Sequence, residues 1–385
     1  LVIRWLSVEQ YALYTITNTM LAAMTMLADG GIASGVMSQG GKVWKDKDRL
    51  GSVIATGIQL RRKFGVVAFV VAIPILNYLL ISNGATIGQA IAISLCLVPT
   101  FVSALTGTLL RIGPKLNQDI QSLQGIEVTS NLGRLVLNVT VLFLFPFSSL
   151  AILTTGLSQI YANWRLRKLS VRHLTPRREP IPEVSSEIQS VVKRILPNTI
   201  YFCLSSQITI WIVSILGNPA QIAKIGALGR ISVILSILVS IFATLVVPRF
   251  ARMGQDPKRI AIRFYQIVTS LIILATMFNL LAWAFPSLFL ILLGDKYAGL
   301  TMLLRWSLAA ATFDVLNQVA KKLMNSRGLI IPPTIYIPLA IAAQTIALWS
   351  QDLTQIEGVF TAAILSSGFV FVVRNTYFIS ANREP

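Results

Sequence analysis

The stretch RLRKLSVRHLTPRREPIPEVSSEIQSVVKR, residues 165–194, decides how the rest of the chain is organised. It is the longest polar interval in an otherwise apolar sequence, and it holds eight Lys and Arg residues against three Glu residues. A basic cluster between membrane spans is normally retained on the cytoplasmic side. The stretch therefore predicts two transmembrane bundles, residues 1–164 and 195–385, joined by a basic cytoplasmic connector at 165–194. Three prolines, Pro176, Pro180 and Pro182, predict an irregular chain within it.

The composition is that of a polytopic membrane protein. Of the 385 residues, 54% are hydrophobic and only 12% are charged, and the mean hydropathy is +0.70. The net charge of +18 would attract nucleic acid, but the basic residues lie in short loops beside apolar runs. In that position they set topology and contact anionic lipid headgroups. We therefore expect membrane lipids as partners and exclude nucleic acid.

Residues for catalysis or metal binding are scarce in the sequence. The one His, His173, lies in the connector, and the two Cys, Cys96 and Cys203, lie inside apolar runs. The sequence has no carboxylate cluster, no nucleophile–base pair and no phosphate-binding loop. We therefore predict a protein that is not an enzyme, with no metal site and no cofactor.

Eleven complete membrane spans are expected from the apolar runs, and the loops between them alternate in charge. All but five of the 33 Lys and Arg residues lie in or flank alternate loops, which assigns that side to the cytoplasm. The expected spans are 11–36, 64–82, 86–110, 130–147, 148–164, 195–216, 223–247, 264–283, 300–320, 329–349 and 358–378.

The start of the chain predicts a missing helix. Leu1 to Ser7 read as the end of a helix, because a span needs about 20 apolar residues. One further helix would give twelve spans, six per half. The order of long span, basic loop and span recurs, ending at Asp46–Arg49 and at Asp256–Arg259. The predicted fold is an all-α membrane bundle of two pseudo-symmetric six-helix halves.

Charged residues within the expected spans are the first candidates for a functional site. Each such charge costs at least about 2.5–3.5 kcal/mol on insertion scales, so it normally faces a wet cavity or a partner. Arg230 follows two glycines that open space for a neighbouring helix or a ligand. Asp29 precedes Gly30-Gly31, so satisfying loosened backbone explains it as well as a coupling role does. The set is Asp29, Lys224, Arg230, Arg305 and Asp314.

Uncharged polar residues in the spans indicate a hydrated interior. Asn198 and Gln207 lie on the span after the connector and are candidates for contacts with a substrate. Hydrogen bonding between helices explains them equally well. Lys224 lies within one turn of a helix end, where its side chain can reach the headgroups.

Four short motifs carry a resemblance to a known family. The segment Arg4 to Tyr14, RWLSVEQYALY, is similar to the end of the first helix in polysaccharide-unit flippases of the multidrug/oligosaccharidyl-lipid/polysaccharide exporter superfamily. The other three motifs are LADGGI at 27–32, IGALGR at 225–230 and LGDKY at 293–297. The chain departs from the pattern at Ala12, where the family usually has Gly.

The resemblance implies a flippase that moves an undecaprenyl-pyrophosphate-linked oligosaccharide across the inner membrane by alternating access, for surface polysaccharide such as O-antigen. It implies a pyrophosphate site with Arg230, Arg305 and Arg4, a polar cavity with Asn198 and Gln207, and coupling or cavity roles for Asp29 and Asp314. Glycan polymerase and glycosyltransferases are the further partners it implies.

Two alternatives remain open from the sequence. A cation-coupled antiporter of small molecules or drugs from the same superfamily would also have twelve spans, with Asp29 and Asp314 as proton or cation sites. A membrane glycan polymerase or ligase would need a large external catalytic loop, and every predicted external loop is short.

Overall fold

The computed structural model describes residues 2–175, 179–216, 218–251, 253, 256–327, 329 and 331–381. Within these ranges the backbone alone is described at residues 206, 207, 209, 216, 243, 244, 248, 251, 295, 326 and 381. The described residues form helices and no strands, and the chain divides into two compact units, Leu1–Ala220 and Gln221–Pro385. The predicted all-α class with two halves is confirmed.

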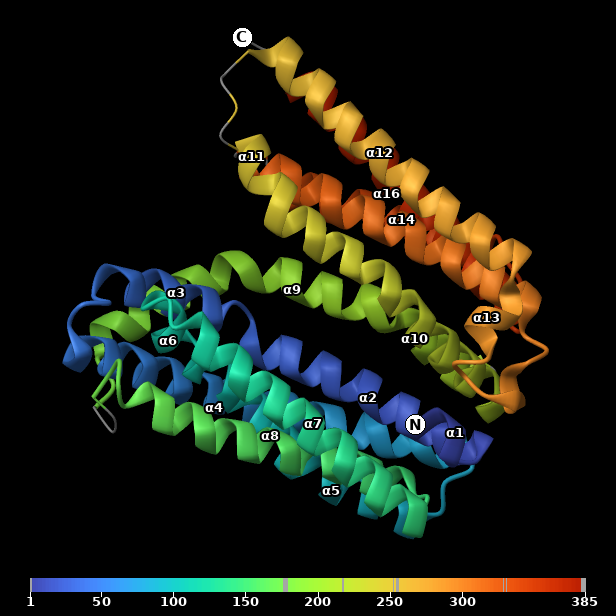
Figure 1. The fold of residues 1–385 in the computed structure, drawn as a ribbon, viewed down its shortest axis with the longest axis horizontal. Coiled ribbons are helices and arrows are strands. Elements are labelled where there is room, and N and C mark those ends of the chain that lie inside the picture. The colour runs from blue at the N-terminus through green and yellow to red at the C-terminus, as the bar shows by residue number, and fades with distance from the viewer. Residues whose placement is uncertain are drawn as a thin grey trace. The chain divides into compact units, whose positions relative to one another are not determined.

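The first unit holds nine helices among its described residues, coloured blue to green in Figure 1. They are α1 (Val2–Trp5), α2 (Val8–Asp29), α3 (Ile32–Lys42), α4 (Lys47–Ser82), α5 (Ile87–Leu110), α6 (Ile112–Leu116), α7 (Ile120–Leu144), α8 (Ser148–Ser170) and α9 (Pro182–Leu216). The helix α10 (Pro219–Ile241) begins at the boundary and belongs mainly to the second unit.

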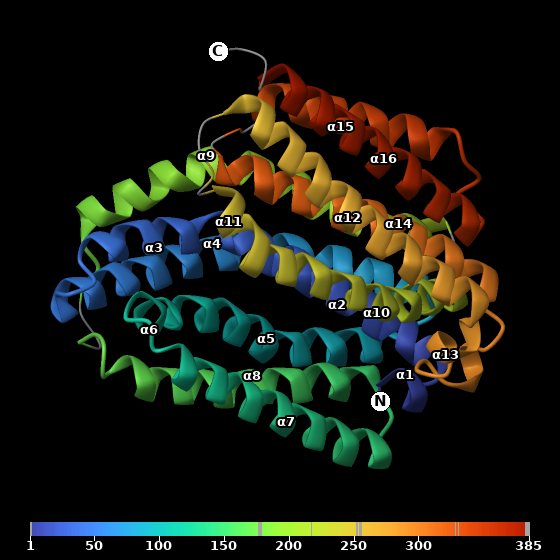
Figure 2. The same ribbon diagram turned by 45° about the horizontal axis from the view of Figure 1, so that its top comes forward.

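The second unit continues with a π-helical turn and six α-helices within its described part. These are η1 (Phe242–Val246), α11 (Val247–Ala251), α12 (Pro257–Ala284), α13 (Pro286–Leu290), α14 (Thr301–Ser326), α15 (Pro333–Trp349) and α16 (Ile356–Ala381), with a 3₁₀ turn at Asp295–Tyr297. Figure 2 shows α12, α14, α15 and α16 running side by side.

Six helices of the described chain are long and apolar enough to cross a membrane: α4, α5 with its continuation α6, α7, α10, α12 and α16. A seventh span results if the bent pair α2–α3 counts as one. Helices also form at the remaining expected spans, but α15 has 17 residues, and α8, α9 and α14 are too polar or charged by this measure. The protein is thus a multi-pass membrane protein.

Close contact between α5 and α8 forms the centre of the first unit. A Cβ added at Gly156 would lie 2.4 Å from Thr100 Oγ1, and one at Gly107 would lie 2.6 Å from Asn163 Oδ1. The Asn163 amide donates to the Ser103 carbonyl at 2.7 Å. Small residues thus let the two backbones approach, and polar side chains then bond across the interface, as is usual between membrane helices.

The connector is shorter than the sequence predicts. α8 continues to Ser170 and α9 begins at Pro182, so of the described connector residues only 171–175 and 179–181 lie outside a helix. Lys168 Nζ lies 3.7 Å from the centre of the Trp164 ring, which stabilises the last turns of α8. Pro182 is the first residue of α9, a position where its missing N–H removes no helical hydrogen bond.

The helix α9 packs in the first unit, whereas the sequence analysis places residues after 194 in the second bundle. It contacts α2, α3 and α4. Ile188 and Val192 are buried there, and Asn83 at the end of α4 donates to the Ser214 carbonyl at 2.9 Å. Lys42 forms an ion pair with Glu187 at 3.6 Å on the side of α3. The unit boundary therefore lies at 220/221, because the apolar face of α9 packs against helices that precede the connector.

In the second unit, aromatic stacking and hydrogen bonds from side-chain amides join the helices. The rings of Phe264 on α12 and Phe378 on α16 are stacked, with centroids 3.9 Å apart, and both are fully buried. Asn279 on α12 donates to the Thr312 hydroxyl on α14 at 2.8 Å. The helices α12, α14 and α16 thereby form one packed layer.

Candidate functional site

A sharp bend separates α2 from α3. The two helices meet at 42°, and the break lies at Gly30 and Gly31, whose φ angles are +47° and +98°. Both glycines adopt left-handed backbone that other residues rarely tolerate. Asp29 ends α2, and its Oδ1 accepts a hydrogen bond from the Ala33 N–H at 3.1 Å. A helix start has unpaired N–H groups, so this carboxylate satisfies one of them at the first turn of α3.

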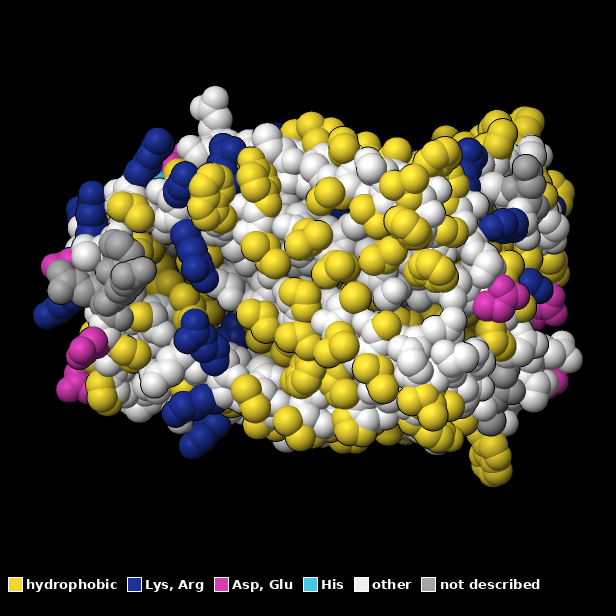
Figure 3. Space-filling model, turned by 90° about the horizontal axis from the view of Figure 1, so that it is seen from below, with side chains coloured by type: hydrophobic (Ala, Val, Ile, Leu, Met, Phe, Trp, Pro, Cys, Tyr) yellow, Lys and Arg dark blue, Asp and Glu magenta, His cyan; other side chains and the backbone are white. Residues whose placement is uncertain are grey.

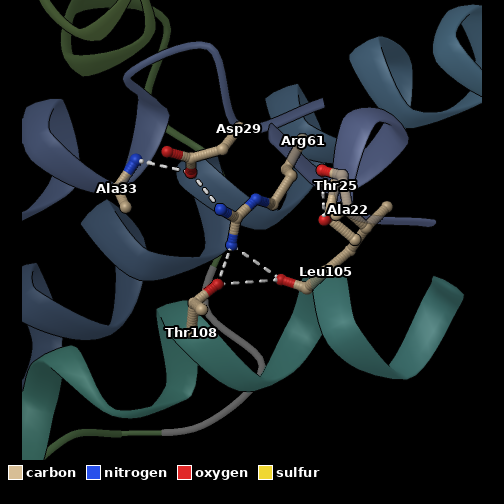
Figure 4. A network of polar contacts seen from close by, with 7 residues as sticks. All are labelled: Ala22, Thr25, Asp29, Ala33, Arg61, Leu105 and Thr108. Atoms are coloured by element: carbon tan, nitrogen blue, oxygen red, sulfur yellow. Dashed lines mark hydrogen bonds and ion pairs between the residues drawn. The ribbon is translucent and has the colours of Figure 1, made fainter. Parts of the chain in front are cut away.

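The same carboxylate is ion-paired with Arg61 of α4. Arg61 Nη2 contacts Asp29 Oδ1, while Nη1 donates to the Leu105 carbonyl at 2.7 Å and to the Thr108 hydroxyl (Figure 4). The Arg61 side chain is only 5% exposed and that of Asp29 is 29% exposed. One guanidinium therefore joins α2, α4 and α5, and through Asp29 it also holds the start of α3.

This pair answers the question that the sequence left open about Asp29. The carboxylate does satisfy loosened backbone, and it also neutralises a buried cation. Sequence reasoning missed Arg61, which it counted among the topology-setting bases of a loop. Arg61, Arg62 and Lys63 are consecutive, and consecutive helical residues are 100° apart, so three of them cannot all face solvent equally. That spacing was the available signal.

The bend also closes against α9. A Cβ at Gly31 would lie 2.9 Å from Ile195 Cβ, and one at Gly35 would lie 3.0 Å from Ile188 Cγ2. At Gly30 a Cβ would lie 3.1 Å from Leu196 Cδ1. A change of the α2–α3 angle must therefore move α9 or break these contacts. We call the set of Asp29, Gly30, Gly31 and Arg61 the hinge cluster.

In the second unit, polar side chains gather between α14, α15 and α16. The Ser367 hydroxyl donates to Asp314 Oδ1 at 2.9 Å, and Asn317 Nδ2 donates to the Ser367 carbonyl at 2.8 Å. Asn317 Oδ1 is buried and has no hydrogen-bond partner among the described residues. Asp314 itself is exposed. The Asp314 carboxylate thus accepts a hydrogen bond from a hydroxyl, and it forms no ion pair within the described part of the chain.

Arg374 of α16 is a buried cation of this unit. Its side chain is deeply buried, with Nη1 donating to the Asn317 carbonyl at 2.6 Å and Nη2 to the Tyr336 hydroxyl at 2.9 Å. The guanidinium carbon also lies 5.2 Å from the centre of the Tyr336 ring. Arg374 lies within the expected span 358–378 but is not among the charged residues singled out from the sequence, so its burial was missed.

The predicted cargo-binding cations lie on both units. Arg230 on α10 is exposed, and a Cβ at the adjacent Gly229 would meet nothing within 4 Å. Arg305 on α14 lies 5.1 Å from the centre of the Trp283 ring and donates to the Trp283 carbonyl at 3.4 Å. Arg4 is exposed in α1 of the first unit. Arg230 and Arg305 lie on different helices of the second unit, and their joint site stays a prediction.

The predicted polar candidates are placed in part. Asn198 is half-buried on α9. The side chain of Gln207 lies outside the described residues. No group of three or more His, Cys, Asp or Glu side chains that could hold a metal ion occurs in the described ranges.

Comparison with known proteins gives matches by structure alone. No family model matches the sequence, and no curated protein matches it. An inward-facing multidrug resistance MATE family transporter of the MOP superfamily aligns with 98% of this chain and 92% of its own, with a TM-score of 0.79 at 14% identity. The fold is that of a MATE transporter.

Two further solved structures bear on the state and the chemistry of the MATE fold. An outward-facing MATE transporter covers 99% of this chain and 90% of its own, at TM-score 0.67 and 15% identity. A MOP superfamily transporter from Pyrococcus furiosus, described as having a binding pocket of reverse polarity that suggests a different function, covers 98% and 89%, at TM-score 0.66 and 15% identity. The superfamily fold implied by the sequence motifs is confirmed, and the polysaccharide-flippase branch stays a prediction.

Proposed function

We propose that this protein is a membrane transporter that moves an amphipathic organic solute by alternating access. The observation that carries the proposal is the match of nearly the whole chain to solved transporters in both inward-facing and outward-facing states. Two compact units and a glycine hinge in the first supply elements that can move.

The charges within the helices favour an anionic cargo. The Asp29 carboxylate is neutralised by Arg61 within the first unit. In the second unit, the charged residues singled out from the sequence are Lys224, Arg230, Arg305 and Asp314, so bases exceed acids. A pyrophosphate needs guanidinium partners in a low-dielectric site. We therefore propose an undecaprenyl-pyrophosphate-linked oligosaccharide as the cargo, with Arg230 as the residue that carries binding.

The second candidate is cation-coupled export of drugs or other small molecules. Several solved neighbours are described as multidrug resistance or MATE transporters, and this supports the antiporter at least as well as the flippase. In that mechanism a proton or cation would compete with Arg61 for Asp29, or would bind at Asp314. The reverse-polarity description of the Pyrococcus furiosus protein supports the view that pocket charge differs between proteins of this fold.

Transport by the purified chain in proteoliposomes separates the two candidates. The flippase predicts translocation of a pyrophosphate-linked oligosaccharide that is lost in Arg230→Ala and partly restored in Arg230→Lys, because a single ammonium cannot grip phosphate in two places. Ethidium transport driven by a proton or sodium gradient, with Arg230→Ala unaffected, would instead establish the antiporter. Normal specific activity of Arg230→Ala toward the lipid-linked sugar would refute the cargo proposal.

A further inference from the structure

A pocket of about 600 Å³ lies in the first unit, outside the hinge cluster. It is formed by α4, α5, α8 and the connector that follows α8. Its apolar lining includes Ile54, Ile58, Leu110 and Leu174. Arg62 of α4 and Arg167 of α8 also line it, and no Asp or Glu does so among the described residues. The pocket is therefore apolar inside, with two cations contributed by different helices.

The wall formed by the connector is fixed to α4 by hydrogen bonds. The Thr175 N–H donates to the Lys47 carbonyl at 3.0 Å, and the Thr175 hydroxyl donates to Asp48 Oδ1 at 2.5 Å. On the far side of residues 176–178, the Ile181 N–H donates to the Thr56 hydroxyl at 3.0 Å. These bonds fix the described connector residues Thr175 and Ile181 to α4, so the pocket is part of the folded unit.

The two arginines lie at the level where the apolar surface ends. On α4, the exposed apolar residues begin at Val66, one turn after Arg62. On α8, Trp164 is exposed just before Arg167, and aromatic residues of this kind mark the membrane–water interface. Figure 3 shows this face: Lys and Arg side chains gather toward one end, with hydrophobic side chains in a recess beside them. Arg62 and Arg167 therefore lie at headgroup depth.

We propose that this pocket binds one anionic phospholipid of the cytoplasmic leaflet. Its phosphate is held by Arg62 and Arg167, and one acyl chain enters the apolar interior. A guanidinium group can donate two parallel N–H···O hydrogen bonds to one phosphate. Basic pockets between membrane helices on the cytoplasmic side bind anionic headgroups. The volume lies within the range of roughly 300–1,000 Å³ typical of ligand pockets. None of the residues assigned to the cargo lines it, so the lipid is a resident of the first unit.

Native mass spectrometry of the purified full chain tests the charge requirement. The delipidated protein is offered phosphatidylglycerol or phosphatidylcholine with the same acyl chains. The wild type is expected to retain one phosphatidylglycerol at least tenfold more than phosphatidylcholine, and Arg62→Glu with Arg167→Glu loses that preference. The matched control is Arg165→Glu, which lies on the same helix, contacts Tyr161 and is not part of the pocket lining. Equal retention of the two lipids, or an equal loss in the control, overturns the proposal.

Filling the pocket tests the requirement for an acyl chain. Ile58→Trp keeps both arginines and is expected to abolish retention of phosphatidylglycerol. Ala55→Leu fills less of the pocket and is expected to reduce retention, and it serves as the test if Ile58→Trp unfolds the protein. The tail-less headgroup glycerophosphoglycerol is expected not to compete. The proposal is overturned if filled variants that melt like the wild type retain the lipid unchanged. It is also overturned if the headgroup alone competes, because the contact would then be electrostatic and at the surface.

Discussion

Among the described residues, each unit buries one arginine between its helices, and the two arginines have different partners. Arg61 in the first unit is ion-paired with Asp29 next to a glycine bend. Arg374 in the second unit bonds a carbonyl and a phenol, with no carboxylate partner found among the described residues. A buried charge without compensation is unfavourable, so each unit satisfies its cation by a different route.

The difference indicates where a switch can form. An ion pair can be broken by protonating or competing for the carboxylate, whereas a guanidinium bonded to a carbonyl offers no such titration. The Asp29 pair also holds two adjoining helices at a left-handed glycine break. We therefore expect the first unit to contain the hinge that responds to ions or cargo, and the Arg374 cluster to be a fixed joint.

The largest effect is expected from removing Arg61. Arg61→Ala leaves Asp29 partly buried without its cation, and breaking a buried pair in this way costs about 3–5 kcal/mol. Denaturant unfolding of the purified protein measures the loss. Asp29→Asn combined with Arg61→Gln should recover part of it, because no unpaired charge remains. A loss under 1 kcal/mol in the single variant would mean that the pair is screened by water.

A smaller loss is expected at Arg374. Arg374→Gln leaves no carboxylate unpaired, and the glutamine amide can keep one of the two hydrogen bonds, so about one charged hydrogen bond, worth about 1.5–3 kcal/mol, is lost. The same unfolding assay should therefore show a smaller shift than Arg61→Gln. Tyr336→Phe, which removes the phenol and keeps the ring, is the matched control and should have the smaller effect of the two. If Arg374→Gln proved the more damaging, the contrast between the units would be wrong.

The glycine bend is the next test of the comparison. Gly31→Ala places a methyl group on left-handed backbone, at about 1–2 kcal/mol, and within contact of Ile195. We expect a lower melting temperature and reduced transport per inserted molecule. Gly41→Ala, within the adjoining α3, is the control, since a Cβ there meets nothing within 4 Å. Equal behaviour of the two variants would argue against a hinge.

The smallest effect is expected at Asp119, outside the membrane spans. Hydrogen bonds from Ser122 and then from His173 hold the pKa of the Asp119 carboxyl below its usual value of 3.8. A depressed pKa adds stability that is complete above the unfolded value and is lost as pH falls through the folded one. Asp119→Asn should therefore be slightly less stable than wild type at neutral pH, and the gap should close as pH falls through the lowered pKa of the folded Asp119 carboxyl. Melting curves at graded pH detect this, and a gap that widens on acidification would contradict it.

The sequence predicted much of the fold because the signals are additive along the chain. Apolar length places helices, and the end of α8 at Ser170 and the start of α9 at Pro182 both lie within residues 165–194. Gly30-Gly31 indicated loosened backbone, but the expected span 11–36 runs through the bend between α2 and α3, which the structure alone shows. The cargo residues Arg4, Arg230 and Arg305 stay predictions, because their joint placement depends on contacts between distant segments.

What the sequence determined by itself is the class of molecule: an all-helical, multi-pass membrane protein in two halves, with one strongly basic side. These properties follow from transfer free energy and charge placement, which depend on local composition. The tertiary structure alone decided that α9 packs on α2, α3 and α4. It alone also decided that Arg61 is buried within α4, rather than exposed in a loop, and neutralises Asp29. Such pairings depend on which face of each helix meets which neighbour. The rotation and packing of the helices determine which faces meet. The sequence alone does not reveal that Asp29 and Arg61, which are 32 residues apart in the chain, form a pair.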